Sequence, residues 1–176
     1  MPSDMDHLRE HAEHDTANII YREMQPGEER SASDVIVRGF QEFISPRYPR
    51  AGVRDFLACV SPLALRERVA GTHTILVALA GSQVVGVADI DNFRHIDLLF
   101  VDKAYHGRGI AHELVSRAVK RAREVQPQLT EITADTSEYG LSTYESMGFR
   151  PAGPELIEGG RHFHRVRLRL KKTSRR

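Results

Sequence analysis

The chain has 176 residues but only one cysteine, and it contains no long hydrophobic run. Because Cys59 has no second cysteine to pair with, an intramolecular disulfide is excluded, and the lone thiol fits a reducing compartment. We expect Cys59 to be a small buried side chain in a helix rather than a nucleophile. A membrane-spanning helix needs about 20 consecutive apolar residues, so no membrane is expected as a partner.

The chain also lacks an excess of charge of either sign, because 25 Lys and Arg residues balance 24 Asp and Glu residues to a net charge of +1. This balance argues against nucleic acid as a partner. The segment 165–176 carries seven basic residues that first alternate with apolar ones, which predicts a strand with one solvated face and then a basic tail. Contact of this tail with RNA or an acidic protein is the alternative interpretation. The N-terminus carries acidic residues and histidines where a secretory signal needs an apolar core, so we expect a cytoplasmic protein.

Several common site motifs are missing as well. The sequence has no Gly-x-x-x-x-Gly-Lys-Ser/Thr phosphate loop and no Gly-x-Ser-x-Gly nucleophile elbow. His112 stands where a Rossmann fingerprint needs its third glycine, which argues against a dinucleotide site. His7, Glu10 and His11 spell the His-x-x-Glu-His pattern of some zinc peptidases, but they precede the predicted fold and have no supporting layer of residues. We therefore predict a solvated tail there and no metal site.

The hydrophobic periodicity predicts one domain over residues 18–171, between a polar tail (1–17) and a basic tail (172–176). Strands are expected at 18–23, 74–79, 83–91, 95–101, 129–136, 149–157 and 162–170, and helices at 28–44, 53–70 (interrupted or kinked near Pro62), 109–124 and 137–147. Hairpins alternate with crossover helices in this order. The predicted fold class is therefore α/β (α+β), with three layers and a mixed central β-sheet of about seven strands flanked by about four helices.

The most informative segment is Leu98 to Ala111, which reads as a buried strand, a short loop and then glycines at 107 and 109 that open a helix. Backbone N–H groups at such a junction can converge on one small volume, and the helix N-terminus adds a partial positive charge. This arrangement predicts an anion site suited to a pyrophosphate.

Together with the downstream segment YESMGF (Tyr144 to Phe149), this segment resembles the GNAT superfamily of acyl-CoA-dependent N-acetyltransferases, and within it a bacterial subgroup with no assigned substrate. The resemblance covers the chain from Asn18 to Leu170. The family's Gln/Arg-x-x-Gly-x-Gly/Ala loop falls on His106, Gly107, Arg108, Gly109, Ile110 and Ala111, with His106 departing at the first position. The resemblance implies acetyl-CoA as co-substrate, with the pantetheine arm along Leu99, Phe100 and Val101, and with Ser137 in place of the family's helix-opening Asn.

The resemblance also implies attack of a neutral amine on the acetyl-CoA thioester, without an acyl-enzyme and without a metal. Tyr144 is the expected acid for the leaving thiolate, and a backbone N–H at Phe100 or Val101 is the expected oxyanion donor. Asp97 is favoured as the base, with His95 second, and a chain of solvent molecules without a dedicated base is an equal alternative.

We expect the acceptor to be a small-molecule amine, bound beside the first two helices, the 45–52 loop and the segment 155–163. The candidate acceptor residues are Phe40, Phe43, Arg47, Tyr48, Asp89 and Arg161. Two other functions stay open: a non-catalytic acyl-CoA-binding or regulatory module, and an acetylase of protein or aminoacyl-tRNA. A homodimer also stays open.

Overall fold

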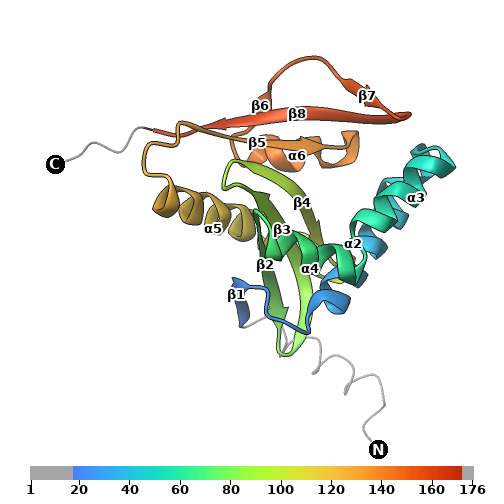
Figure 1. Cartoon of the computed structure of the whole chain (residues 1–176). Helices are drawn as coiled ribbons and strands as arrows, with labels where there is room; N and C mark the ends of the chain where they lie inside the picture. Colours follow the sequence, from blue (N-terminus) through green and yellow to red (C-terminus); the bar gives the residue numbers. More distant parts are fainter. Residues whose placement is uncertain (1–17, 172–176) are drawn as a thin grey trace, which may run out of the picture.

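The structure is a computed structural model that describes residues 18–171. The predicted tails 1–17 and 172–176, and with them the His-x-x-Glu-His pattern, lie outside the described residues. The elements are drawn in Figure 1. In chain order they are β1 (Ile19–Glu23), α2 (Glu29–Phe43), the 3₁₀ helix η1 (Ser45–Arg47), α3 (Arg50–Cys59), α4 (Pro62–Ala70), β2 (His73–Ala80), β3 (Gln83–Asp91), β4 (His95–Val101), η2 (Lys103–Tyr105), α5 (Ile110–Val125), β5 (Glu131–Thr136), α6 (Glu138–Ser146), β6 (Arg150–Pro151), β7 (Leu156–Glu158) and β8 (Arg161–Arg169).

The strands form one mixed sheet in the order β1-β2-β3-β4-β5-β8-β6, and β7 pairs with β8 outside this path. All neighbouring strands are antiparallel except β4 and β5, which run parallel. The side chains of α2 and α4 form one buried cluster with the sheet, and those of α5 and α6 form another. The predicted three-layer mixed α/β fold is therefore confirmed.

Strands β2 and β3 are the centre of the fold, because both of their faces are covered. Along β2, Ile75, Val77 and Leu79 belong to the cluster on the α2 side, whereas Leu76, Ala78 and Ala80 belong to the α5 side. Successive strand residues point to opposite faces, so an almost continuous apolar run is what a strand buried on both faces requires. This rigid centre carries β4, the strand on which the candidate site is built.

Prolines divide two of the expected segments. The interruption expected near Pro62 in the helix 53–70 is confirmed, because Pro62 starts the separate helix α4 and the Ser61 hydroxyl accepts a hydrogen bond from the N–H of Ala64 at 3.2 Å. The expected strand 149–157 is two short strands, because Pro151 and Pro154 have no N–H to give to β8. The described residues thus contain eight strands and five α-helices, against the expected seven and four.

The parallel pair β4 and β5 separates soon after it begins. The strands are in register only at His95 with Thr133 and at Ile96 with Ala134. From Asp97 to Val101, β4 pairs with β3 but has no strand partner on its β5 side among residues 18–171. An open strand edge in the middle of a sheet is therefore available to a ligand. Within residues 18–171, no helix has both the length and the apolar character needed to cross a membrane.

Candidate active site

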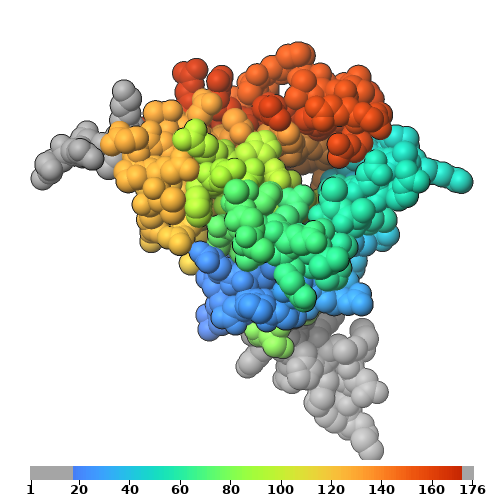
Figure 2. Space-filling model, viewed as in Figure 1, coloured from blue at the N-terminus to red at the C-terminus, as the bar shows by residue number. Residues whose placement is uncertain are grey.

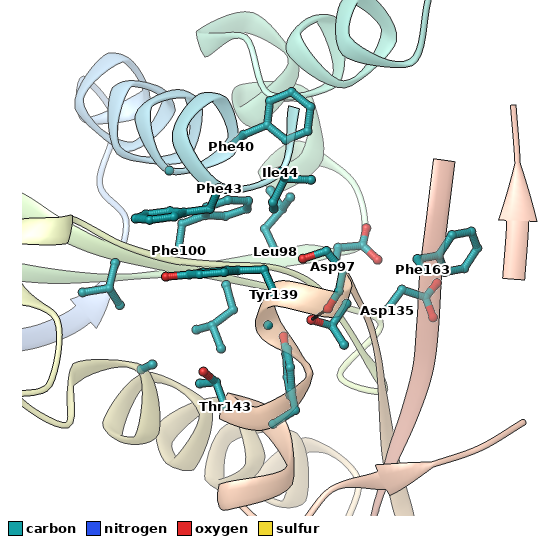
Figure 3. Close-up of a pocket in the computed structure, with 18 of the residues that line it drawn as sticks. Phe40, Phe43, Ile44, Asp97, Leu98, Phe100, Asp135, Tyr139, Thr143 and Phe163 are labelled. Carbon is teal, nitrogen blue, oxygen red and sulfur yellow. Dashed lines mark hydrogen bonds between the residues drawn. The ribbon is translucent and has the colours of Figure 1, made fainter. Parts of the chain in front are cut away.

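A cavity of about 610 Å³ opens along the separated edge of β4. Its walls come from α2, the α3–α4 region, β4, the loop before α5, α6 and the β7–β8 hairpin. In Figure 3 the side chains of Asp97, Asp135 and Phe163 lie toward one end of this cavity, and Phe43 and Tyr139 lie toward the other. Figure 2 shows the hollow between the teal α3 region and the orange-red C-terminal strands. A cavity of this size is typical of small-ligand sites.

The loop Gly107 to Gly109 forms one end of the cavity. Gly109 precedes α5 with a φ of +78°, a left-handed conformation that favours glycine. Among the described residues, the backbone N–H groups from Gly107 to His112 donate no hydrogen bond to the chain. Unsatisfied donors at a helix N-terminus are suited to an anion, and the pyrophosphate site stays a prediction.

His106 has a different role from the loop glycines. Its Nε2 lies 2.8 Å from the carbonyl oxygen of Val101, so the imidazole donates a hydrogen bond that ties the loop to the end of β4. Its ring also lies 5.6 Å from the ring of Phe43 on α2. At the position where the family usually carries Gln or Arg, His106 therefore braces the loop. Arg108 points elsewhere, with its guanidinium 4.9 Å above the ring of Tyr105.

The backbone of β4 alternates between its two neighbours. The N–H of Asp102 donates to the carbonyl of Val85, and the register pairs Phe100 with Val87. Because paired residues alternate in antiparallel strands, Phe100 directs its N–H toward β3, while Leu99 and Val101 direct theirs into the gap. Val101 fits the expected oxyanion donor, and Leu99 joins it. Phe100 contributes its side chain, which packs against the Phe56 ring at 6.2 Å.

Asp97 is the extra residue of a β-bulge, because Asp89 pairs with Leu98 while the next residue, Ile90, pairs with Ile96. The bulge turns the Asp97 carboxylate into the cavity, where its side chain stays 30% exposed. Arg68 of α4 holds this carboxylate, with Nη1 at 3.0 Å from Oδ2. The same guanidinium lies 2.7 Å from the carboxylate of Asp89.

Asp89 lies beneath the cavity rather than in it. Its side chain is fully buried, and Nδ1 of His73 lies 2.9 Å from Oδ1. Burial raises the pKa of the Asp89 carboxyl, and the charges of His73 and Arg68 act against that effect. The sequence placed Asp89 among the acceptor ligands, but this burial leaves it no surface for an acceptor. Its role is to anchor Arg68.

His73, Asp89 and Asp97 each offer one ligand atom within a span of 4.8 Å, which is the spacing that a metal ion needs. The Arg68 guanidinium, however, already donates to both carboxylates. A cation bound there would meet a positive charge that the cluster already contains. This geometry describes an ion-pair network of the protein and does not fit a metal ligand set.

His95 stands between two carboxylates of the cavity floor. Its Nε2 lies 3.5 Å from Asp97 and 3.6 Å from Asp135, while its Nδ1 lies 2.7 Å from the hydroxyl of Thr133. Asp135 is itself held by two hydrogen bonds of 2.8 Å from Arg165. Asp97 and His95, the two candidate bases, therefore lie side by side at the end of the open edge.

Tyr144 reaches the cavity from α6 and is only 4% exposed. Its ring packs edge-on against Phe149 at 5.1 Å. Burial, followed by the charges of Asp135 and Asp97, raises the pKa of its phenol above the ordinary value of 10.0. The phenol thus stays protonated through the neutral range, as a proton donor must.

The remaining predicted residues are placed as follows. Ser137, Ile110 and Ala111 line the cavity, and so do Phe40, Phe43, Tyr48 and Arg161 on the acceptor side. Arg47 lines a smaller neighbouring cavity instead. Cys59 is exposed rather than buried, contrary to the expectation from its helical context.

Sequence reasoning missed several cavity residues, among them Asp135, Arg68, Tyr139 and Phe56. Arg68 lies in α4, a helix whose apolar pattern gave no sign of a functional residue. Tyr139 stacks on Phe43 with ring centroids 4.5 Å apart and thereby joins α6 to α2 (Figure 3). Phe56 stacks on Phe40 at 3.9 Å. The position of Tyr139 inside the YESMGF-bearing helix was the one signal that could have identified any of them.

The fold and this site define an acyltransferase of one family. Residues 44–170 match the family model described as "Acetyltransferase (GNAT) domain", and the chain belongs to this family. The predicted family and enzyme class are thereby confirmed.

Individual relatives support the same assignment. The chain is similar to the "Uncharacterized N-acetyltransferase YafP" of Escherichia coli (strain K12), with 27% identity over 142 residues, covering 80% of this chain and 87% of YafP. Its fold is similar to a GCN5-related N-acetyltransferase from Rhodopseudomonas palustris, with a TM-score of 0.75, 18% identity and coverage of 88% and 97% of the two chains. It is also similar to the PaiA N-acetyltransferase from Thermoplasma acidophilum in complex with coenzyme A, with a TM-score of 0.70, 16% identity and coverage of 84% and 98%.

Proposed function

We propose that this protein transfers an acetyl group from acetyl-CoA to a primary amine of a small molecule by direct attack in a ternary complex. The observation that carries the proposal is the single cavity of about 610 Å³, which connects the free N–H groups of the loop with Asp97 along the open edge of β4. The coenzyme A in the PaiA structure supports the cofactor. The enclosing walls on the acceptor side favour a small acceptor.

The loop and the strand edge would hold acetyl-CoA, which supplies the activated acetyl thioester. The N–H groups from Gly107 to His112 face outward from the start of α5 and suit the two phosphate charges. Leu99 and Val101 offer backbone groups to an extended arm, as an added strand would use them. The same N–H groups are placed to stabilise negative charge on the acetyl oxygen, and one such donor can contribute about 10² to 10³ in rate.

The proton steps fall to the opposite end of the cavity. An ammonium group has no lone pair, so the acceptor must lose a proton before it attacks. Asp97 receives this proton in our proposal, directly or through water, because the bulge exposes its carboxylate to the cavity. His95 at 3.5 Å is the second candidate and can relay the proton onward to Asp135. Tyr144 gives its phenolic proton to the departing thiolate.

The proposal is tested by measuring acetyl-CoA binding and thiol release on the same four proteins. Wild type is expected to bind acetyl-CoA and to release free thiol with members of a panel of small amines. Gly109→Trp should lose both activities, because it blocks the loop. Asp97→Asn should keep the binding but lose about 10² to 10⁴ in turnover, the usual contribution of a general base. Asp34→Asn, an exposed carboxylate on α2, is the matched control.

Two results would contradict the proposal. If wild type does not bind acetyl-CoA, the nucleotide site is inactive and the assignment fails. If thiol is released only with peptide or tRNA acceptors, and strongly dependent on salt, the acceptor is a macromolecule. Undiminished turnover by Asp97→Asn would instead transfer the base to His95 or to a solvent chain.

A further inference from the structure

Arg161 is a charged side chain of the cavity that the mechanism leaves unused. It begins β8, lines the acceptor side and is partly buried. Within residues 18–171 it makes no ion pair and no hydrogen bond, although the other arginines of the site are tightly bound. Arg68 holds Asp89 and Asp97, and Arg165 holds Asp135 with two bonds of 2.8 Å.

The side chain of Arg161 packs closely against helix α3. A Cβ on Gly52 of α3 would lie 3.1 Å from Cγ of Arg161, so the glycine leaves room for the arginine stem. Glycine inside a helix costs about 0.5 to 1 kcal/mol relative to alanine. The neighbouring Gly160 packs equally closely on Pro49, which brings the tip of the β7–β8 hairpin against the start of α3. Figure 1 shows this hairpin tip and α3 on the same side of the molecule.

Arg161 and Tyr48 line the same cavity. Burial raises the pKa of the Tyr48 phenol, and the positive charge of Arg161 acts against that effect. Glu158 is the cross-strand neighbour of Arg161 in the hairpin register, but within residues 18–171 the two side chains form no ion pair. The guanidinium of Arg161 is therefore available to a ligand in the cavity that Tyr48 also lines.

The distance along β8 separates Arg161 from the reaction centre. Arg165, the arginine that holds Asp135, follows Arg161 by four positions, which corresponds to roughly 13 Å of strand. Phe163 lies between them on the same face of β8 and also lines the cavity. Along β8 the acceptor space thus has Arg165 with Asp135 near the reaction centre, Phe163 next, and Arg161 farther away.

We propose that Arg161 and Tyr48 form a subsite for the carboxylate of an acceptor that carries both an amine and a carboxylate. The inference rests on the proposed function and names the substrate class for the same cavity. A guanidinium binds a carboxylate through two parallel hydrogen bonds. A single carboxylate matches the single positive charge of Arg161, which forms no ion pair within residues 18–171. A phosphate would bring a charge of about −1.5 to −2 into a cavity that already holds Asp97, Asp135 and Glu158.

The test compares acceptor pairs that differ only in the carboxylate. Suitable pairs are phenylalanine with phenethylamine, 4-aminobutyrate with butylamine, and 6-aminohexanoate with hexylamine, with kcat/KM measured by thiol release. In at least one pair the carboxylate member should be preferred about tenfold to hundredfold, the contribution of a charge-assisted hydrogen bond. Arg161→Gln should reduce this ratio at least tenfold. Arg169→Gln, which changes an exposed arginine at the other end of β8, should keep it.

A binding measurement separates this inference from the proposed function. The N-acetylated form of each compound is titrated into full-length protein saturated with CoA, which requires no turnover. Tighter binding of the carboxylate form that is lost in Arg161→Gln supports the subsite even if thiol release fails. Equal affinity within every pair, or a preference that persists in Arg161→Gln, overturns it. Preference for phosphoethanolamine over every carboxylate acceptor would overturn the choice of carboxylate.

Discussion

Tyr144 illustrates how a single side chain obtains its chemical character from its surroundings. The phenol is 4% exposed and packed on Phe149, and burial raises its pKa well above the range in which a free tyrosine ionises. The raised pKa keeps the proton on the phenol at neutral pH, so Tyr144 is in the protonated form that an acid needs. In the proposed reaction the phenol would give this proton to the departing thiolate.

For this single side chain we predict that Tyr144→Phe lowers kcat by about 10² to 10⁴, while the affinity for acetyl-CoA stays within a few-fold of wild type. The ring and its contact with Phe149 are kept, so only the proton donor is lost. Thiol release and isothermal titration measure the two quantities. Tyr139→Phe, which keeps the stack on Phe43, serves as the matched control. A kcat within threefold of wild type in Tyr144→Phe would assign the acid role elsewhere.

Helix α4 shows how an element positions a residue of the site from a distance. Its first turn is fixed by Pro62 and by the Ser61 hydroxyl, which accepts the N–H of Ala64. Its last turn carries Arg68, which reaches across to the bulge of β4 and holds Asp97 at 3.0 Å. A separate helix α4, rather than one long helix from α3, therefore sets the direction from which Arg68 arrives.

We predict that Ser61→Ala destabilises the protein by about 1 kcal/mol, because the N-cap bond is lost. For a chain of this length that corresponds to a decrease in Tm of about 2 to 4 °C. Thermal unfolding followed by circular dichroism checks the value. Ser116→Ala on the exposed face of α5 has no cap to lose and should leave Tm unchanged. Equal behaviour of the two variants would show that Pro62 alone starts α4.

At the scale of the whole molecule, several carboxylates have pKa values that hydrogen bonds lower in the folded chain. Glu28 accepts two hydrogen bonds from Arg22 of β1, at 2.8 and 2.6 Å. This hydrogen bonding lowers the pKa of the Glu28 carboxyl. The hydroxyl of Thr72 lowers the pKa of Asp91 at the end of β3. A backbone hydrogen bond lowers the pKa of Glu29 at the start of α2. Each of these groups binds a proton more readily in the unfolded chain.

The free energy of unfolding should therefore stay level from neutral pH to about pH 5 and decrease at lower pH, since the unfolded carboxyls have pKa values of about 4. Below the folded pKa values, the contribution of these groups is lost. Glu28→Gln should cost less than about 1 kcal/mol at pH 7, and its difference from wild type should vanish at acid pH. Urea unfolding at several pH values measures this difference in the free energy of unfolding. Glu124→Gln is the control and should show no comparable pH-dependent difference from wild type. A constant difference down to pH 3 would contradict the linkage.

The sequence could predict those site residues that belong to one continuous segment of the chain. The loop from His106 to Ala111 is one continuous segment, and a strand followed by glycines and an amphipathic helix places its N–H groups by local geometry alone. Tyr144 follows from the same short-range pattern. Arg68 and Asp89 are 21 residues apart and meet only because α4 packs over the sheet. No local pattern marks such a pair.

The sequence by itself determined the order of strands and helices, the three-layer fold and the anion-binding loop, because periodicity and turn residues act over short distances. Tertiary structure alone decided where β4 separates from β5, that Asp97 is lifted by a bulge, and that Asp89 is buried beneath the cavity. It also decided that Arg161 lines the same cavity as Tyr48 and, within residues 18–171, forms no ion pair there. The physical reason is that register, burial and ion pairing depend on which segments meet, and distant segments meet only in the folded chain.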